Sequence, residues 1–402
     1  MSRAGLLRRL GGLLLLASAT LLATGCGMFS GMGEKVSDSM ASTYDWAFGA
    51  SGPKPSELVV FKPSATLKVL WQAAAGPAER AMFTPVVVDG GILVANAAGT
   101  VTLLSARDGK AVWRTDLKTR LSGGVGSDGR MSAVGSARGE VITLDATGKE
   151  LWRAQLSSEV LAPPQMADGF VIARSGDNRV FGLDAVSGQR RWFYQRQLPP
   201  LAIRSTAGVV VTRGGVFVGF PGGRLVALAV TNGAVGWEAA VSLPRGATEL
   251  ERIADIASSP VADGRAVYAA AFQGRLGAFD LVNGQQLWVR DVSSYAGMGM
   301  DTRNLYVTDD KGAVLALDKS AGASVWRQDK LGGRQATAPL AFGRYVVVGD
   351  LQGYVHVLSR EDGAFVARIA TDGSRISMPP IVLDESFIVQ TRNGGVYALT
   401  LQ

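Results

Sequence analysis

The sequence predicts an all-β fold, an eight-bladed β-propeller of four-stranded antiparallel blades, from three observations. One unit recurs eight times along the chain. Each unit spans roughly 40 residues, the usual size of a propeller blade. The last copy stops half-way, and its missing half lies at the start of the repeat region. Because a four-stranded blade has two apolar faces, the blades must close into a ring to bury them.

The repeated unit has a recognisable order of strand, turn and strand. A segment such as VTLLSA alternates with the strand period of two. An Asp-Gly, Asn-Gly or Ser-Gly turn follows, in which glycine tolerates a positive φ. The next strand carries a tryptophan, which we expect to pack between blades. The copies cover residues 99–113, 139–152, 178–192, 223–237, 274–288, 312–326, 353–367 and, as a half copy, 394–402.

The half copy predicts how the ring closes. The segment GGVYALTLQ (394–402) ends before a tryptophan-bearing outer strand, and LKVLW (67–71) supplies one at the other end of the repeat region. We expect the C-terminal strands to pair with N-terminal strands near residues 59–71, in a ring that covers residues 58–402. This pairing ties the chain ends together and hides strand edges that would invite aggregation.

The start of the chain has the pattern of an export signal. A basic segment and an apolar stretch precede three small residues and the only cysteine: Arg3, Arg8 and Arg9, residues 10–22, Ala23-Thr24-Gly25, and Cys26. The apolar stretch is too short for a stable transmembrane helix, so the order predicts a signal peptide over residues 1–25.

The small residues before Cys26 resemble the bacterial lipobox, although its usual leucine is replaced by Ala23. The resemblance implies cleavage before Cys26 and a lipid on its thiol; the alternative is an ordinary signal peptide with an incidental cysteine. Gly27 follows the cysteine, and the resemblance to enterobacterial sorting signals implies the outer membrane. Residues 26–57 begin with a Gly-, Ser- and Met-rich stretch and are expected to form a lipidated tether.

Charge and rare residue types exclude several function classes. The formal net charge is +7, and the three arginines of the expected signal leave +4 (7 − 3) on the remainder. No run of Lys or Arg has the density typical of nucleic-acid binding. With one cysteine and one histidine, Cys26 and His356, neither an intrachain disulfide nor a common zinc site can form. We therefore expect no metal and no cofactor.

Two connections between units are longer than the others. The intervals from Trp192 to Trp237 and from Trp237 to Trp288 contain extra residues, at 194–208 and 243–260. Both insertions follow an outer strand and precede the next inner strand, so they are expected to form one adjacent patch that binds a partner. The alternative is neutral drift in loop length. Apolar side chains flanked by charges favour a protein interface: Leu201, Ile203, Arg204, Glu249, Glu251, Arg252 and Asp255.

Three features of the sequence could indicate a catalytic or phosphate-binding site, but a structural role is favoured for each. Residues 124–129 match GxGxxG but no helix is predicted after them, which favours a hairpin-rich loop. His356 lies in a predicted strand, in phase with Tyr354 and Leu358, and is expected to be structural. Four aspartates recur before the turn of the unit, which favours turn hydrogen bonding over a catalytic site: Asp145, Asp184, Asp280 and Asp318.

The unit Leu-Asp-Ala-x-x-Gly-x-x-x-Trp resembles the repeat of quinoprotein dehydrogenases, whose adjacent cysteine pair this chain lacks. Signal, lipobox, eight repeats and two long connections together resemble the BamB family of outer-membrane β-barrel assembly lipoproteins. The segments LAIRS (201–205) and ATELERIADI (247–256) are similar to the family's stretches that contact the POTRA domains of BamA. The resemblance implies this role for Leu201, Ile203, Arg204 and Asp255, whereas the family's second aspartate falls on Ala257.

The resemblance implies a non-catalytic scaffold on the periplasmic face of the outer membrane, held there by the lipid on Cys26. Its expected partners are the POTRA domains of BamA and unfolded strands of outer-membrane proteins, with no nucleic acid. Two other functions stay open at this stage. One is a pyrroloquinoline-quinone-dependent dehydrogenase-like propeller, and the other is a propeller that binds cell-wall glycans.

Overall fold

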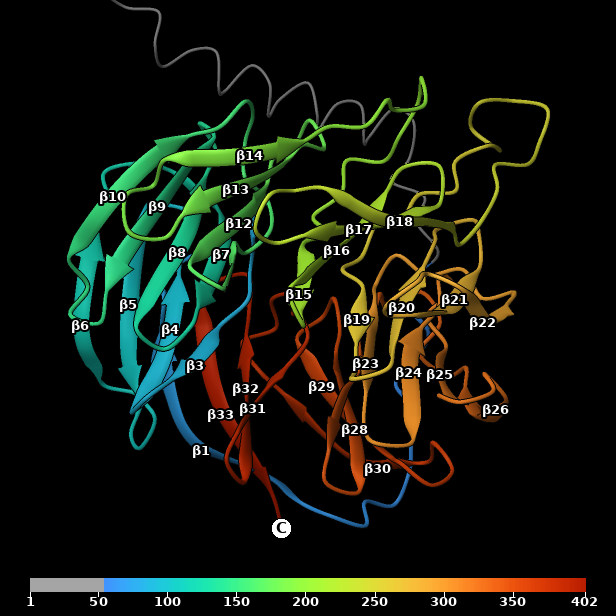
Figure 1. The fold of residues 1–402 in the computed structure, drawn as a ribbon. Coiled ribbons are helices and arrows are strands. Elements are labelled where there is room, and N and C mark those ends of the chain that lie inside the picture. Colours follow the sequence, from blue (N-terminus) through green and yellow to red (C-terminus); the bar gives the residue numbers. More distant parts are fainter. Residues whose placement is uncertain (1–53) are drawn as a thin grey trace, which may run out of the picture. The chain divides into compact units, whose positions relative to one another are not determined.

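A computed structural model describes residues 54–402, which form one compact unit from Lys54 to Gln402 (Figure 1). The predicted signal peptide, the predicted lipidation site Cys26 and residues 26–53 of the predicted tether lie outside the described residues. In the described part, no helix is long and apolar enough to cross a membrane. The fold class agrees with the prediction, because strands β1 to β33 form eight sheets, one for each blade.

The first four blades follow one another along the chain, each with its strands ordered from the inner to the outer edge of the ring. Blade 1 contains β3 (Val86–Val88), β4 (Gly91–Ala95), β5 (Thr100–Ser105) and β6 (Ala111–Asp116). Blade 2 contains β7 (Leu121–Ser127), β8 (Met131–Ser136), β9 (Glu140–Asp145) and β10 (Glu150–Gln155). Blade 3 contains β11 (Gln165–Ala167), β12 (Phe170–Arg174), β13 (Val180–Asp184) and β14 (Arg190–Tyr194). Blade 4 contains β15 (Val209–Thr212), β16 (Gly215–Phe220), β17 (Arg224–Ala229) and β18 (Val235–Ala240).

The other four blades repeat this order, and the last takes its outer strand from the N-terminal end of the described chain. Blade 5 contains β19 (Val261–Ala262), β20 (Ala266–Ala270), β21 (Leu276–Asp280) and β22 (Gln286–Arg290). Blade 6 contains β23 (Met298–Met300), β24 (Asn304–Thr308), β25 (Val314–Asp318) and β26 (Ser324–Gln328). Blade 7 contains β27 (Leu340–Phe342), β28 (Tyr345–Gly349), β29 (Tyr354–Ser359) and β30 (Phe365–Ala370). Blade 8 contains β31 (Ile381–Leu383), β32 (Ser386–Gln390), β33 (Gly395–Leu401) and β1 (Leu67–Ala74).

The hydrophobic core lies between neighbouring blades. One cluster joins Ile172 and Trp192 of blade 3 to Val216 and Val226 of blade 4. The repeated tryptophans belong to these contacts, as predicted: the indole N–H of Trp192 donates to the carbonyl of Val230 in the next blade, at 2.9 Å. A side chain at Gly233, which has a φ of 69°, would collide with the same indole. The glycine of the turn is therefore needed both for its backbone angle and to leave room for the ring.

The ring closes through the split blade. Strand β1 pairs antiparallel with β33, from Leu67 opposite Leu401 to Ala74 opposite Gly395. The pairing begins at Thr66, which exchanges two backbone hydrogen bonds with Gln402, and not near residue 59, because residues 56–64 run instead along blades 6 and 7 as a strap. The amide of Ser64 donates to the carbonyl of Val366 at 3.0 Å. The N-terminal part of the described chain is thus fastened to a blade other than the one it completes.

The GxGxxG segment differs from its prediction, because most of it is a strand and not a loop. Residues 121–127 form β7, the inner strand of blade 2, and β2 (Met82–Phe83) pairs with it in parallel. A Cβ at Gly126 would overlap the carbonyl oxygen of Pro164. The glycines therefore let this strand approach the neighbouring connection closely, a reason that local turn chemistry does not reveal.

The connections between blades all leave at one end of the ring. In a blade of four antiparallel strands, the link from the outer strand to the next inner strand emerges at the same end as the turn between the second and third strands. We call this end the connector face. Connector 1 (residues 195–208) and connector 2 (residues 241–260) project from it as the long yellow-green and yellow loops of Figure 1.

Candidate functional site

Connectors 1 and 2 form one continuous surface on the connector face, which confirms the prediction that they lie side by side. The hydroxyl of Ser205 in connector 1 donates to the carbonyl of Ala257 in connector 2, at 3.1 Å. The hydroxyl of Ser259 accepts the amide N–H of Gly208 at 2.8 Å. Residues about fifty positions apart in the sequence therefore hold the two loops together.

Asp255 is the centre of this arrangement. Its Oδ2 accepts the amide of Ile203 in connector 1 at 2.7 Å, and its Oδ1 accepts the amide of Gly222 in blade 4 at 2.9 Å. Its own carbonyl accepts the amide of Phe272 in blade 5 at 2.8 Å. Because the residue is 2% exposed, its carboxylate is occupied inside the chain. The structure thus gives Asp255 the geometry of a residue that positions the connectors.

A buried arginine lies beside this carboxylate. Arg174, at the end of β12, donates to the carbonyl of Ala207 at 3.0 Å and stacks over the ring of Phe220. Burial lowers the pKa of Arg174 to about 10, while the negative charge of Asp255 opposes this shift. The guanidinium stays protonated at neutral pH, and its hydrogen bonds to the carbonyl of Ala207 and the side-chain oxygen of Asn178 satisfy it in this buried place.

Arg204 is paired with a residue of the connection between blades 2 and 3. Its guanidinium makes two contacts with Glu159, with Nε at 2.9 Å from Oε1 and Nη2 at 2.7 Å from Oε2. Both residues line a cavity of about 260 Å³ on the connector face, together with Met82 and Leu161. The arginine side chain is 69% exposed, so the pair contributes little to stability, about 0–1 kcal/mol. Arg204 can therefore exchange this contact at small cost.

Apolar side chains accompany Arg204 on this surface. Leu201 is 40% exposed, and Ile203 is half-buried beside Asp255. The most exposed large hydrophobic residue of either connector is Leu250, at 67%. Sequence reasoning passed over Leu250 because it selected the charged residues around it.

A local hydrogen-bond pattern holds the turn that carries Leu250. The Glu251 carboxylate accepts the amides of Thr248 at 3.1 Å and Ala247 at 2.8 Å, and these bonds lower the pKa of Glu251. The amide of Glu251 in turn donates to the hydroxyl of Thr248 at 3.3 Å. This reciprocal arrangement is a capping box, so the Thr-x-x-Glu spacing was the available signal for a fixed turn around Leu250.

The residues interpreted as structural in the sequence have structural contacts. His356 is fully buried in β29, and its Nε2 lies 2.9 Å from Oδ2 of Asp350. Each of the four recurring aspartates accepts backbone amides of its own turn, for example Ser187 N to Asp184 at 2.9 Å. The other three show the same pattern: Asp145, Asp280 and Asp318. The predicted turn hydrogen bonding of the aspartates is confirmed, and His356 lies buried in its predicted strand.

Comparison with known proteins gives consistent matches over the propeller. The family described as "Outer membrane protein assembly factor BamB" matches residues 54–118, 97–328 and 310–402. A protein of that name from Nitrosomonas eutropha is 41% identical over 348 residues, which cover 86% of this chain and 85% of that protein. The crystal structure of BamB from Moraxella catarrhalis superposes with a TM-score of 0.77 at 27% identity, covering 83% of this chain and 99% of that one.

The ring is also similar to that of an enzyme. Quinohemoprotein alcohol dehydrogenase from Comamonas testosteroni superposes with a TM-score of 0.68 over 83% of this chain and 76% of that one. The identity is 15%, so this likeness concerns the fold alone.

Proposed function

This chain belongs to the family of the outer membrane protein assembly factor BamB, and from that premise we propose that it is a non-catalytic scaffold of the β-barrel assembly complex. In this role it binds the POTRA domains of BamA and assists the folding and insertion of outer-membrane proteins. The relatives are named as assembly factors, which supports a role without catalysis.

The observation that carries the proposal is the joined surface of connectors 1 and 2. Leu201, Ile203 and Arg204 supply apolar contacts and one replaceable ion pair, and Asp255 holds their backbone in place. We add Leu250, because a single well-exposed apolar side chain on a fixed turn suits an anchor for a partner. In this proposal the four residues that the family resemblance implied act in two ways. Asp255 lies beneath the contact surface, whereas Leu201, Ile203 and Arg204 lie on it.

The decisive experiment measures binding of the purified POTRA domains to the full chain by calorimetry. We expect Arg204→Glu to weaken binding at least about tenfold, or about 1.4 kcal/mol, because it places a like charge beside Glu159 and removes the cation. Glu159→Ala frees Arg204 and is expected to preserve or strengthen binding. Arg107→Glu, in the exposed β5–β6 turn at the opposite end of the ring, makes the same charge change as a control.

Each possible result of this binding experiment tests one part of the proposal. Unchanged binding by Arg204→Glu removes that residue from the interface. Equal weakening by Arg204→Glu and Arg107→Glu indicates a general charge effect and excludes a specific contact. No binding by the unaltered chain contradicts the proposed partner itself.

The proposed location is the periplasmic face of the outer membrane, with a lipid on Cys26. The signal pattern, the small residues before Cys26 and the names of the relatives support it. Labelled palmitate should be incorporated into the chain, and Cys26→Ser should abolish incorporation. A labelled Cys26→Ser variant would contradict the assigned site.

A second proposed contact is with unfolded strands of outer-membrane proteins. The outer strands, such as β6 and β10, pair on one side only within their sheets. Their other edges present backbone donors and acceptors, which suit the addition of an extended strand. This contact is independent of connectors 1 and 2.

A further inference from the structure

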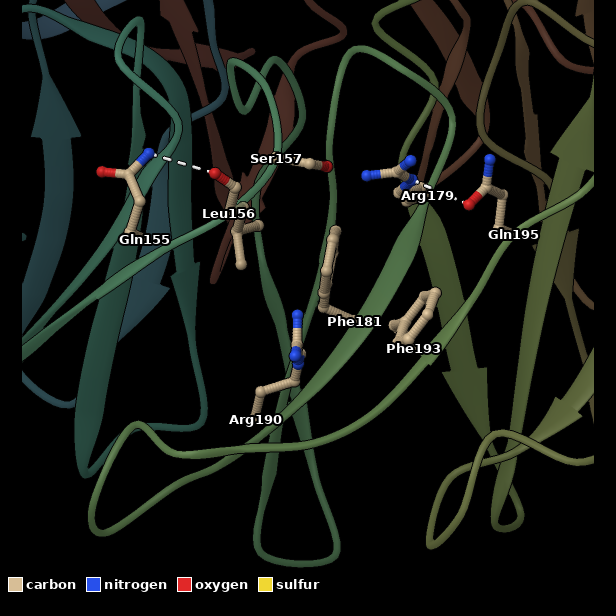
Figure 2. Close-up of a pocket in the computed structure, with 8 residues that line it drawn as sticks. All are labelled: Gln155, Leu156, Ser157, Arg179, Phe181, Arg190, Phe193 and Gln195. Atoms are coloured by element: carbon tan, nitrogen blue, oxygen red, sulfur yellow. Dashed lines mark hydrogen bonds between the residues drawn. The ribbon is translucent and has the colours of Figure 1, made fainter.

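The junction between blades 2 and 3 contains a groove of about 320 Å³. Figure 2 shows its wall from blade 2, which includes Leu156 and Ser157, and its wall from blade 3, which includes Phe181, Arg190 and Phe193. The volume is at the lower end of ligand pockets, which suits one or two side chains of a bound segment better than a cofactor.

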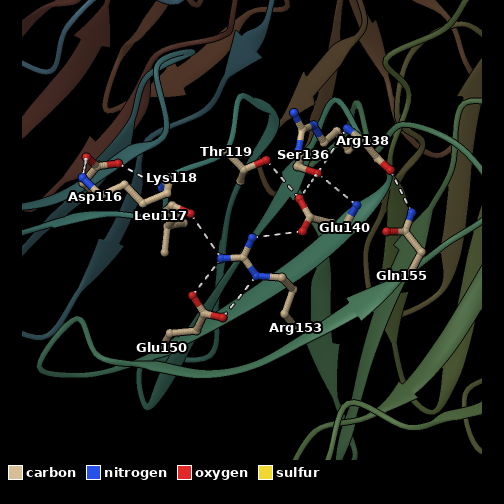
Figure 3. A network of polar contacts seen from close by, with 10 residues as sticks. All are labelled: Asp116, Leu117, Lys118, Thr119, Ser136, Arg138, Glu140, Glu150, Arg153 and Gln155. Carbon is tan, nitrogen blue, oxygen red and sulfur yellow. Dashed lines mark hydrogen bonds and ion pairs between the residues drawn. The ribbon is translucent and has the colours of Figure 1, made fainter.

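The equivalent junction between blades 1 and 2 is closed by charges. Arg153 of β10 contacts Glu140 and Glu150, each at 2.9 Å, and donates to the carbonyl of Leu117 in the connection from blade 1, at 3.2 Å (Figure 3). The Glu140 carboxylate also accepts the hydroxyl of Thr119 at 3.0 Å. Arg153 is therefore paired with two carboxylates of its own blade, and its bond to Leu117 also connects the two blades.

Blade 3 has a different type of residue at all three positions. Counting from its tryptophan, Phe193 stands where Arg153 stands in blade 2, and Arg190 stands where Glu150 stands. Arg179, the residue before the first buried valine of β13, takes the position of Glu140. The junction thus has two cations and an aromatic ring in place of two acids and a cation, so the bridge to the preceding blade is missing.

The two arginines differ in their contacts. Arg179 donates to the side-chain oxygen of Gln195 at 3.0 Å and lies 3.5 Å from the carboxylate of Asp177. Arg190 stacks over the ring of Phe193 at 5.4 Å and makes no ion pair with any residue between 54 and 402. No carboxylate lines the groove itself, so Arg190 is the cation of the groove that can pair with a carboxylate from a partner.

Phe193 gives the groove an apolar floor that opens to solvent. Its ring stacks against the buried Phe181, with centroids 6.2 Å apart, yet 52% of the residue is exposed. Six of the other seven blades place a charged or amide side chain at this position: Arg114, Arg153, Glu238, Arg327, Arg368 and Gln72. An exposed aromatic at a position where the fold accepts arginine is not required for folding, which indicates a binding role.

We propose that this groove binds an extended segment of a protein partner in which an apolar side chain lies next to a carboxylate. The apolar side chain packs on Phe193 and the carboxylate pairs with Arg190, which restores the charge balance that blade 2 achieves internally. The free edge of β14 lies alongside, because β14 pairs only with β13 in its sheet. The groove touches connector 1 only at its first residue, Gln195, and includes none of Leu201, Ile203, Arg204 and Leu250, so its test does not depend on POTRA binding.

The test uses the full chain and fluorescein-labelled peptides. The probe is Ser-Gly-Asp-Phe-Asp-Gly-Ser, with an Asp-to-Asn version and a Phe-to-Ala version as matched peptides, and binding is measured by fluorescence polarisation. The protein variants Phe193→Arg and Arg190→Glu each install the residue of blade 2. Val289→Arg makes the same exchange to arginine at the equivalent position of blade 5, which tests for a non-specific effect.

We expect the probe to bind the unaltered chain and to lose at least about tenfold in affinity in either groove variant. Val289→Arg should bind as the unaltered chain does, and both altered peptides should bind more weakly. Absence of binding to the unaltered chain, or equal binding by Phe193→Arg, overturns the proposal. Tighter binding of the Asn peptide also overturns the proposal, because that peptide has no carboxylate to pair with Arg190.

Discussion

Asp350 and Asp255 are two buried carboxylates on the connector face that stabilise different parts of the molecule. Asp350 lies 2.7 Å from the guanidinium of Arg334 and 2.9 Å from His356. Arg334 also donates to the carbonyl of Ser56 at 2.8 Å, so this centre fastens the N-terminal strap. Asp255 instead accepts backbone amides and fastens the two long connectors to each other. One centre serves closure of the ring, and the other serves the proposed interface.

The difference follows from their places in the sequence. Asp350 occupies a repeat position, where a polar side chain accepts the amide four residues later: Tyr354 N lies 2.9 Å from its Oδ1. Asn96 and Asp309 do the same in blades 1 and 6. Asp255 lies in an insertion, outside any repeat. Asp350, at a repeat position, therefore stabilises the propeller that all blades share. Asp255, in an insertion, stabilises the two connectors that are added to that propeller.

The largest expected effect comes from Asp350→Ala. The variant leaves the guanidinium of Arg334 buried without its counter-charge, which typically costs about 3–5 kcal/mol. Urea titration should show this loss in the free energy of unfolding. Asp309→Ala removes the same repeat position from a pair whose Arg327 is 46% exposed, and should cost only about 1–2 kcal/mol. Equal losses in the two variants would show that burial of the pair is not the cause.

A smaller and more local effect is expected from Asp255→Ala. The amides of Ile203 and Gly222 lose their acceptors, at about 1–3 kcal/mol for a buried unsatisfied group, whereas Arg174 keeps its hydrogen bonds to Ala207 and Asn178. Hydrogen exchange should accelerate at these two amides more than in the strands of blades 4 and 5, and POTRA binding should weaken in parallel. Faster exchange with undiminished binding would separate Asp255 from the interface.

The repeat could be predicted from the sequence, but the contacts between distant segments could not. The tryptophans, the turn aspartates and the split blade follow from local patterns that recur, so each copy supports the others. The acceptor role of Asp255 depends on Ile203, which is 52 residues away, and on a loop conformation without any repeat. The groove beside Phe193 needed the strand register, because only the alignment with Arg153 reveals the exchanged charges.

Acidification should destabilise the folded chain through the Asp350 centre. Burial lowers the pKa of His356, with the charges of Arg334 and Arg368 acting in the same direction and Asp350 opposing them. Below about pH 6.5 the unfolded chain therefore binds a proton that the folded chain does not. The free energy of unfolding should be flat above that pH and fall below it, by at most about 1.4 kcal/mol per pH unit.

His356 is the only histidine in the chain, so the source of this slope can be isolated. His356→Gln keeps a side-chain N–H that can reach Asp350 and should remove the slope just below pH 6.5. Burial raises the pKa of Asp350, but the hydrogen bond and charge of His356 and the bonds from Tyr354 and Arg334 outweigh it, so its pKa lies below the usual value. Its own contribution is thus lost only at lower pH. A slope unchanged in His356→Gln would assign it to carboxylates.

The smallest effect is expected from Leu250→Ala, which tests the Asp255 side of the comparison without disturbing any buried group. The side chain is 67% exposed on a turn held by Thr248 and Glu251, so the free energy of unfolding should stay within about 0.5 kcal/mol. If Leu250 anchors the partner, POTRA affinity should fall by about 1 kcal/mol. Val186→Ala, at a 90% exposed valine of the β13–β14 turn, removes apolar area at the opposite end of the ring. Equal affinities of the two variants would place the partner contact away from the tip of connector 2, and would leave Arg204 as the residue that defines it.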